Sequence, residues 1–126
     1  MFDKEDDPLT YEVIGAAMEV HRLMGPGLLE SVYQSCLEEE LTLRRIEHYP
    51  QYRIPLRYKS KQLNQDFVID ICVPKLLVVE LKSVDKIIGI HEAQLLSYLR
   101  LSEIKTGLLI NFNVPLLREG IKRMKI

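Results

Sequence analysis

The sequence predicts an α/β domain in which helices cover a mixed central β-sheet. Two segments with apolar residues at helical spacing come first, and three segments with the alternation or the short apolar runs of strands follow them. A further helical segment and a further apolar run complete the order ααβββαβ, in which the helices must pack on a sheet. With 126 residues and no linker or internal repeat, the chain is expected to form one domain over residues 1–126, with residues 1–7 flexible.

The two N-terminal helices are predicted from apolar spacing and from the residues at their ends. Asp7 followed by Pro8 is typical of an N-cap and a first helical residue, and Gly25 is expected to end the first helix. The second helix is predicted over PGLLESVYQSCLEEELTLRRI, where Arg44 and Arg45 fall in the last turn and suit the helix dipole. The apolar stripes of the two helices are Leu9, Val13, Ile14, Ala17 and Val20, and then Leu29, Val32, Tyr33, Cys36, Leu37 and Leu41.

The middle of the chain changes to the period of strands. YRIPLRY is predicted as a strand whose Pro55 indicates an edge or a bulge, and KSKQLNQ is predicted as a polar turn. Pro74 and Lys75 turn the chain from DFVIDICV into the strand LLVVELK; IHEAQLLSYLRL is then predicted as a helix, TGLLINF as a buried strand and the remainder as a basic tail. Alternation in DFVIDICV assigns one face to Phe67, Ile69, Ile71 and Val73 and the other to Val68, Asp70 and Cys72.

Composition and charge exclude several classes of protein. Apolar residues make up 47% and charged residues 28% of the chain, which is ordinary for a globular protein. No apolar run approaches the roughly 20 residues of a membrane-spanning helix, and the acidic start MFDKEDD differs from a signal peptide. We therefore expect a cytoplasmic protein with no membrane association. Cys36 and Cys72 fit that compartment as buried free thiols, and no cysteine or histidine spacing indicates a zinc site.

One basic run, RIPLRYKSK, contains no acid although the net charge of the chain is −1. Such a run is either a solvated strand edge or a track for phosphates. If it binds nucleic acid, the contacting residues are expected to be Arg57, Lys59 and Lys61. The near-neutral charge and the small size favour a domain that needs a second subunit or a partner protein to hold its substrate.

The stretch VPKLLVVELKSV ends a hydrophobic strand with an acid and a base on one face. Side chains alternate along a strand, so Glu80 and Lys82 point the same way and Leu81 points into the opposite layer. If the preceding turn centres on Lys75, Asp70 lies directly opposite Glu80 in an antiparallel pair, with Cβ atoms about 4.5–5.5 Å apart. A competing two-residue turn would shift the register by one and move Asp70 to the other face.

Two carboxylates this close repel each other unless a cation lies between them. A hard divalent ion such as Mg²⁺, held by Asp70, Glu80 and water molecules, offsets that cost. Lys82 on the same face can orient or deprotonate a water and offset negative charge in a phosphorane-like transition state. Two interpretations stay open from these residues alone: part of a metal-dependent active site, or a charge-balanced cluster near the end of a sheet.

Several segments, taken in order, resemble a known family. IDICVPKLLVVELK resembles the metal-binding hairpin of the PD-(D/E)XK nuclease superfamily. Gly27, Glu30 and Tyr33 stand at the G-x-x-E-x-x-Y spacing of the GxxExxY family within that superfamily. Gln94 and Tyr98 have the Q-x-x-x-Y spacing of the helix motif of RecB-type nucleases. GLLINFNV and GIKRMKI are also similar to the GxxExxY family, so the resemblance covers nearly the whole chain.

The resemblance implies a restriction-endonuclease-like core and a metal site in the hairpin. Asp70 and Glu80 would be the ligands of Mg²⁺ or Mn²⁺, and Lys82 would be the catalytic lysine. Ile69 stands where the superfamily name has proline, a position that is loosely kept within the superfamily.

The two helices would add further residues to the site. Glu30 would reach it as a ligand through water or as a partner of Lys82, and Gln94 would orient Lys82 or the attacking water. Tyr98 and Tyr33 would support the site. Each of these residues also has a structural interpretation: Glu30 as a first-turn acid that suits the helix dipole, and the tyrosines as core aromatics. The predicted catalytic residues are Glu30, Asp70, Glu80, Lys82 and Gln94.

The sequence therefore predicts a Mg²⁺- or Mn²⁺-dependent nuclease, a hydrolase that cleaves phosphodiester bonds in DNA or RNA. The alternative is a catalytically silent nuclease-like domain that binds nucleic acid or a protein partner. The complete set of two acids and a lysine favours the enzyme.

Overall fold

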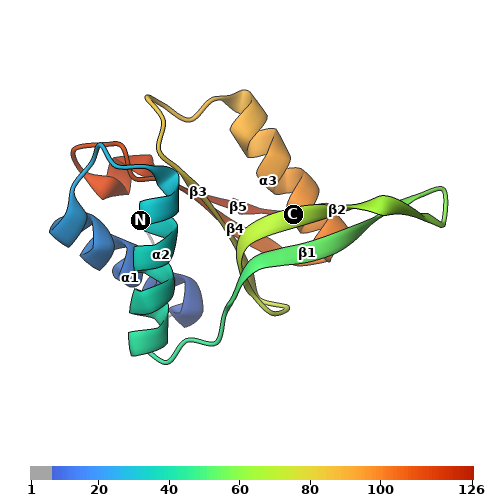
Figure 1. Ribbon diagram of the computed structural model, residues 1–126, viewed down its shortest axis with the longest axis horizontal. Coiled ribbons are helices and arrows are strands. Elements are labelled where there is room, and N and C mark those ends of the chain that lie inside the picture. The colour runs from blue at the N-terminus through green and yellow to red at the C-terminus, as the bar shows by residue number, and fades with distance from the viewer. Residues whose placement is uncertain (1–6) are drawn as a thin grey trace.

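The computed structural model describes residues 7–126 (Figure 1). The expectation that residues 1–7 are flexible therefore lies, except for Asp7, outside the described residues. The elements in chain order are α1 (Pro8–Met24), α2 (Glu30–Leu43), β1 (Tyr49–Tyr58), β2 (Lys61–Val73), β3 (Leu77–Lys82), α3 (Gly89–Ser102), β4 (Thr106–Asn111), the short 3₁₀ helix η1 (Leu117–Gly120) and β5 (Ile121–Lys125).

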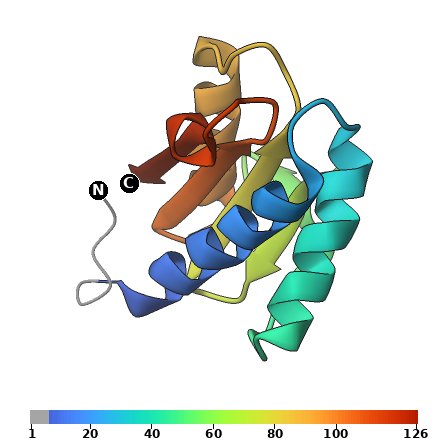
Figure 2. The same ribbon diagram turned by 90° about the vertical axis from the view of Figure 1, so that its left-hand side faces the viewer.

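The strands form one five-stranded mixed sheet in the order β1-β2-β3-β4-β5. The β3–β4 pair is parallel and the other pairs are antiparallel. The crossover between the parallel strands contains α3, as such a connection requires. Helices α1 and α2 cover one face of the sheet and α3 covers the other, which Figures 1 and 2 show from two sides. The predicted arrangement of helices on both faces of a mixed sheet is confirmed.

Two hydrophobic cores lie on the two faces of the sheet. The core beneath α1 and α2 contains Ile71, Val79 and Leu81 from the strands. The core beneath α3 contains Val78 and Leu109 from the strands, together with Leu95 and Leu99 from the helix. Residues 77–81 of β3 are all buried, because helices cover both sides of this central strand.

Helix α1 has the predicted caps. The Asp7 side chain accepts hydrogen bonds from the backbone N–H and the hydroxyl of Thr10, at 3.1 and 2.6 Å. Arg123 of β5 donates to the same carboxylate at 2.8 Å, which ties the helix start to the sheet edge. Gly25 ends the helix with a φ of 70°, a value that favours glycine.

Helix α2 is shorter than predicted. It begins at Glu30 and not at Pro26, because Gly27 has a φ of 94° and interrupts the helical path. Leu29 was assigned to the apolar stripe, but it is the N-cap and is 73% exposed. Arg44 and Arg45 were expected in the last turn, but the helix ends at Leu43, before them.

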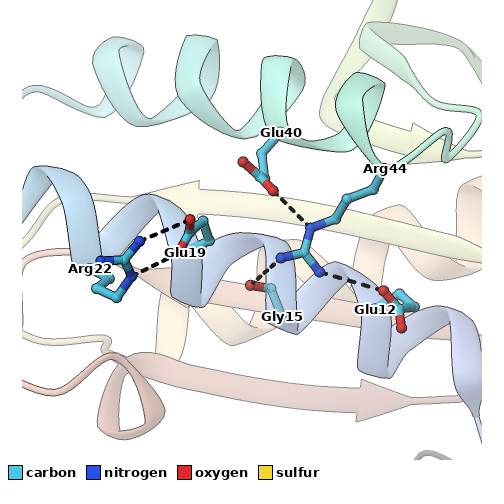
Figure 3. A network of polar contacts seen from close by, with 6 residues as sticks. All are labelled: Glu12, Gly15, Glu19, Arg22, Glu40 and Arg44. Carbon is cyan, nitrogen blue, oxygen red and sulfur yellow. Dashed lines mark hydrogen bonds and ion pairs between the residues drawn. The ribbon is translucent and has the colours of Figure 1, made fainter.

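Arg44 connects the two helices (Figure 3). Its guanidinium lies 2.9 Å from the Glu40 carboxylate on its own helix and 3.5 Å from Glu12 on α1. It also donates to the backbone carbonyl of Gly15 at 3.4 Å. A separate ion pair, Arg22 with Glu19 at 2.8 Å, lies along α1 in the same view. The network thus fixes the end of α2 against the middle of α1.

The β1–β2 hairpin is longer than the sequence predicted. Most of KSKQLNQ, assigned to a turn, belongs to β2, and the turn itself is only Lys59 and Ser60. These two residues have φ values of 49° and 67°, the left-handed conformation that matches the twist of a tight hairpin. Glycine or asparagine usually marks such a turn, and neither is present here. The predicted irregularity at Pro55 is confirmed by a register shift between Pro55 and Arg57 in an edge strand.

The sequence did not predict the fifth strand. The basic segment GIKRMKI contributes β5, which pairs antiparallel with β4, for example Ile121 with Ile110. Lys122 and Lys125 on this edge strand are exposed, so its composition resembles that of a tail. Cys72 is buried, Cys36 is half-buried and both are free thiols. Within residues 7–126, no helix is long and apolar enough to cross a membrane.

Gly120 offers a test of the packing between η1 and the end of β4. A Cβ atom at Gly120 would lie 2.1 Å from the backbone carbonyl oxygen of Asn111, which cannot move without breaking the strand end. We expect Gly120→Ala to lower the unfolding free energy by about 3 kcal/mol, since overpacking against backbone leaves no relief. Gly89→Ala is the control, because nothing lies within 4 Å of a Cβ there. Urea denaturation of both variants checks this, and equal stability of the two would contradict it.

Candidate functional site

The β2–β3 hairpin has the register that places Asp70 opposite Glu80. Val73 pairs with Leu77 and Ile71 with Val79, and the same register leads next to Asp70 and Glu80. The turn centres on Lys75, whose φ is 67°. The register predicted from the sequence is therefore confirmed, and the competing two-residue turn is excluded.

Side chains replace the backbone ladder at Asp70. The regular β2–β3 pairing begins beside the turn, at Val73 and Leu77, and ends at Ile71 and Val79, so that it does not include Asp70. The Asp70 N–H donates to Oε1 of Glu80 at 3.1 Å, and the N–H of Leu81 donates to Oδ2 of Asp70 at 2.8 Å. The Asp70 carbonyl accepts from the side-chain amide of Gln34 on α2 at 2.9 Å. Two strands and one helix thus meet at a single residue.

The predicted alternation of β2 is wrong at this point. Ile71 lies in the core beneath α1 and α2, whereas Ile69 lies in the core beneath α3. Two residues that should share a face therefore point to opposite faces. On the neighbouring strand, Gln51 lies opposite Asp70 and has a φ of 49°, so β1 is irregular at the same level. The break follows from the lost ladder: Asp70 is bonded through side chains, and the strand is free to turn there.

Glu80 is a buried acid beside a second acid. Glu80 is only 4% exposed, and its carboxyl group lies within hydrogen-bonding reach of the Asp70 carboxyl group. Burial raises the pKa of Glu80 from its ordinary 4.5 to about 9, and the negative charge of Asp70 adds to this shift. Lys82 opposes it. In the absence of a cation, the Glu80 carboxyl therefore keeps a proton at neutral pH.

Lys82 and Gln94 border one open cavity of about 370 Å³. Lys82 is half-buried at the end of β3, and alternation places it on the same side as Glu80, beneath α3. Gln94 is exposed at the mouth of the cavity, and Ile90, His91, Ala93 and Ser97 of α3 form the rest of its lining. The expectation that Gln94 borders the pocket around Lys82 is confirmed.

Glu30 and Tyr98 approach the acid pair from opposite faces of the sheet. Burial raises the pKa of Glu30, the charge of Asp70 raises it further, and Lys82 lowers it. Burial also raises the pKa of Tyr98, with additional contributions from Glu80 and Asp70. Glu30 is thus close enough to Asp70 and Lys82 for their charges to act on it, but it is exposed and does not line the cavity that Lys82 and Gln94 border. The Tyr98 ring also packs edge-on against Phe67 of β2, with centroids 6.0 Å apart.

Tyr33 lies apart from the acid pair and holds the loop in front of Glu30. Its ring is fully buried and stacks on Phe112 with centroids 4.5 Å apart. Its hydroxyl donates to the Gly25 carbonyl at 2.5 Å and accepts from the Leu28 N–H at 3.2 Å. Tyr33 therefore fixes both ends of the loop from which Glu30 begins α2.

Two residues that the sequence analysis missed join this loop and helix to the strands. The Ser83 hydroxyl donates to the Leu28 carbonyl at 2.6 Å, directly after Lys82 in the chain. Gln34, described above, follows Glu30 by four residues and so lies on the same side of α2. That spacing is a sequence feature that could have indicated Gln34, whereas nothing in the sequence marks the serine.

The donors fit a hard divalent cation only in part. Asp70 and Glu80 each use one carboxylate oxygen to accept a backbone N–H, and the other oxygen of each could bind a cation. Over residues 7–126, no group of three or more His, Cys, Asp and Glu side chains is close enough together to hold a metal ion. Two carboxylates completed by water match Mg²⁺, which keeps several waters in proteins. Glu30 does not complete a cage of three protein ligands.

The comparisons with known proteins agree with this geometry. The chain matches the family model of the PD-(D/E)XK nuclease superfamily over residues 7–124. The fold is correspondingly a restriction-endonuclease-like α/β fold, with a five-stranded mixed sheet flanked by helices. No curated protein and no solved structure matches the chain.

The loop clamp can be tested by removing one hydroxyl. Tyr33→Phe removes the hydroxyl that pairs with the Gly25 carbonyl and the Leu28 N–H, and we expect the unfolding free energy to fall by about 1–3 kcal/mol. Tyr58→Phe is the control, since its ring is 62% exposed. Chemical denaturation measures both. An unchanged stability of Tyr33→Phe would show that the hydroxyl does not hold the loop.

The acid pair predicts an unusual dependence of stability on pH in the presence of a chelator. The unfolded chain releases the Glu80 proton near pH 4.5, whereas the folded protein keeps it up to about pH 9. The folded state therefore binds more protons between these values, and the unfolding free energy falls as pH rises through them. Glu80→Gln carries no titrating proton at this position, so the difference in stability between the variant and the wild type should grow with pH. Parallel pH profiles for the two proteins would contradict this.

Proposed function

Since the chain belongs to the PD-(D/E)XK nuclease superfamily, we propose that it is a metal-dependent phosphodiesterase that hydrolyses nucleic acid. The observation that carries the proposal is the buried Glu80 beside the half-buried Asp70, with Lys82 on the same side of the sheet as Glu80. A structural ion-pair cluster has no need of two acids so close that one of them must keep a proton. Active sites are where such costly arrangements concentrate.

We also propose the finer assignment to the GxxExxY family. The spacing of Gly27, Glu30 and Tyr33 supports it, and each of the three has a separate task in the same loop and helix. Gly27 permits the turn at a φ of 94°, Tyr33 holds the loop, and Glu30 is carried to the acid pair. The motif thus corresponds to one physical unit that positions an acid.

The hairpin residues supply the centre of the proposed site. A divalent cation, Mg²⁺ or Mn²⁺, bound by Asp70 and Glu80 would supply Lewis-acid activation of water and of the scissile phosphate. Lys82, whose ammonium group interacts with both Glu80 and Glu30, offsets negative charge on the phosphate as the bond breaks.

The helix residues complete the surroundings of Lys82. Glu30 holds a carboxyl on the α2 side, where it can orient the lysine or accept a proton from water. Gln94 orients the lysine or the attacking water from the mouth of the cavity. Tyr98 closes the site beside Phe67 and limits the access of water.

The competing function is a silent domain of the same fold that binds nucleic acid or a protein without cutting it. Its residues would be held in the same positions, so geometry does not separate the two functions. Response to metal and cleavage do separate them.

The decisive experiment pairs thermal melts with a cleavage assay. For the wild type, Mg²⁺ or Mn²⁺ at about 100 times its dissociation constant should add roughly 2.7 kcal/mol of stability. Glu80→Gln should lose most of that increment and all cleavage, and Lys82→Ala should lose cleavage while it keeps a cooperative melt. Substrates are single- and double-stranded DNA and RNA.

Glu39→Gln is the matched control, because Glu39 is an exposed acid of α2 outside the site. It should keep both the metal response and the cleavage. A wild type that neither responds to metal nor cuts any substrate favours the silent domain. If Glu80→Gln unfolds the protein, the acid is structural and the proposal fails.

A further inference from the structure

The β1–β2 hairpin extends beyond the body of the protein (Figure 1). Ile54 and Phe67 form the last pair of this hairpin that packs on the core beneath α3. Beyond them, residues 55–66 form a two-stranded ribbon, since β3 pairs with β2 only up to Ile71. We call residues 55–66 the arm.

The charge of the arm is mainly positive. Arg57, Lys59 and Lys61 are all exposed, and the one acid of the arm, Asp66, is 3.7 Å from Arg53 at its base. The outer part of the arm therefore carries three positive charges and no acid, in a chain whose net charge is −1. Tyr58, between two of these residues, is 62% exposed, and Lys59 Nζ lies 5.6 Å from the centre of its ring.

The arm and the proposed active site lie on one continuous strand. Asp70 lies on β2 four residues after the end of the arm, and the contact between Phe67 and Tyr98 fixes the base of the arm beside the site. From Asp70 to Lys61 the strand spans about 30 Å, at roughly 3.4 Å per residue. The same distance covers about nine base pairs of a duplex, whose rise is also roughly 3.4 Å per step.

We propose that the arm binds the phosphate backbone of double-stranded DNA up to about nine base pairs from the point of cleavage. A two-stranded β-ribbon fits the major groove of B-form DNA, and its basic edges then face the phosphates on either side. The inference rests on the proposed substrate class, nucleic acid, and is independent of the cutting step. The proposal also explains how a nearly neutral domain can bind a polyanion, because positive charge is concentrated on one projecting element.

A different use of the same charges is protection of an exposed strand edge from pairing with other chains. That use requires charge on the arm but no contact with DNA. If the charges only protect the edge, variants with a neutral arm should aggregate. Their affinity for DNA should equal that of other variants with the same net charge. The two uses therefore differ in a measurable quantity.

The test measures binding without cleavage, in EDTA, by fluorescence anisotropy with a labelled DNA duplex of about 24 base pairs, longer than the reach of the arm. The arm variant is Arg57→Gln/Lys59→Gln/Lys61→Gln. The control is Lys105→Gln/Arg118→Gln/Lys125→Gln, three exposed residues of the same types near the opposite edge of the sheet. The conservative variant Lys59→Arg/Lys61→Arg keeps the charge and should keep the affinity. Circular dichroism melts of every variant verify that each is folded.

We expect the arm variant to bind more weakly and the slope of log affinity against log salt to become shallower by about 2.7, since about 0.9 is lost per phosphate contact. The control should change the slope by less than one contact. Equal losses in the two triple variants, no duplex binding by the wild type, or tighter binding of a single strand of the same length would each overturn the proposal.

The cleavage assay keeps this inference separate from the proposed function. Duplex binding that depends on the arm in a protein that never cuts would overturn the nuclease and leave the arm proposal standing. If the arm variant binds and cleaves the duplex as the wild type does, the nuclease proposal stands and the arm proposal is overturned.

Discussion

The structure of the site depends on one constraint: the buried carboxyl group of Glu80 lies beside the half-buried carboxyl group of Asp70 at the point where the regular pairing of β2 and β3 stops. Burial of a carboxylate without partners is costly, and a second one beside it raises the cost. The chain meets this constraint with backbone donors. The N–H groups of Asp70 and Leu81 each donate to the opposite side chain, so the hairpin stays joined although its ladder has stopped. The polar side chains therefore replace the missing hydrogen bonds between the two strands.

The elements around the β2–β3 hairpin are held in place by hydrogen bonds to Asp70 and to the two residues that follow Lys82. Gln34 connects α2 to the Asp70 carbonyl, and Ser83 connects the loop before α2 to the end of β3. On the far side of Lys82, the side chain of Asn111 accepts from the Val84 N–H at 3.1 Å and donates to the Val84 carbonyl at 2.9 Å. The lysine is thus flanked by backbone that is fixed from both α2 and β4. An arrangement of this kind limits the motion of Lys82 to its own side chain.

Local chemistry explains what could be predicted from the sequence. The caps of α1, the turn at Lys75 and the register of the hairpin follow from residue types with strong local preferences, and the acids and the lysine followed from that register. The break in alternation at Asp70 could not be predicted, because it follows from the side-chain hydrogen bonds that replace the ladder between Asp70 and its partner strand, which periodicity does not reveal. The two-residue hairpin turn was missed since its positive φ values fall on lysine and serine.

The remaining differences also have physical causes. Strand β5 was hidden because an edge strand with charged residues has the composition of a tail. Leu29 was misplaced for a different reason: it fits the apolar stripe of the helix, but the turn at Gly27 places it outside the helix. Periodicity identifies which residues can share a face, and only tertiary contacts decide where an element begins. The positions of Glu30 and Gln94 were predicted from a resemblance rather than from periodicity, since no local pattern brings two helices to one lysine.

Strand β2 combines three environments in one length of chain. Its first residues form the basic ribbon, Asp70 lies near its other end, and residues on both sides of Asp70 lie in the cores. A two-stranded ribbon alone is marginally stable in water, so the arm depends on the packing of Ile54 and Phe67 at its base. The Phe67 ring that anchors the ribbon also contacts Tyr98, whose pKa is raised by burial and further by the charges of Glu80 and Asp70. A displacement of the arm by a bound polyanion would therefore act on the Phe67 ring and on the Tyr98 ring that it contacts, because Phe67 and the arm belong to one strand.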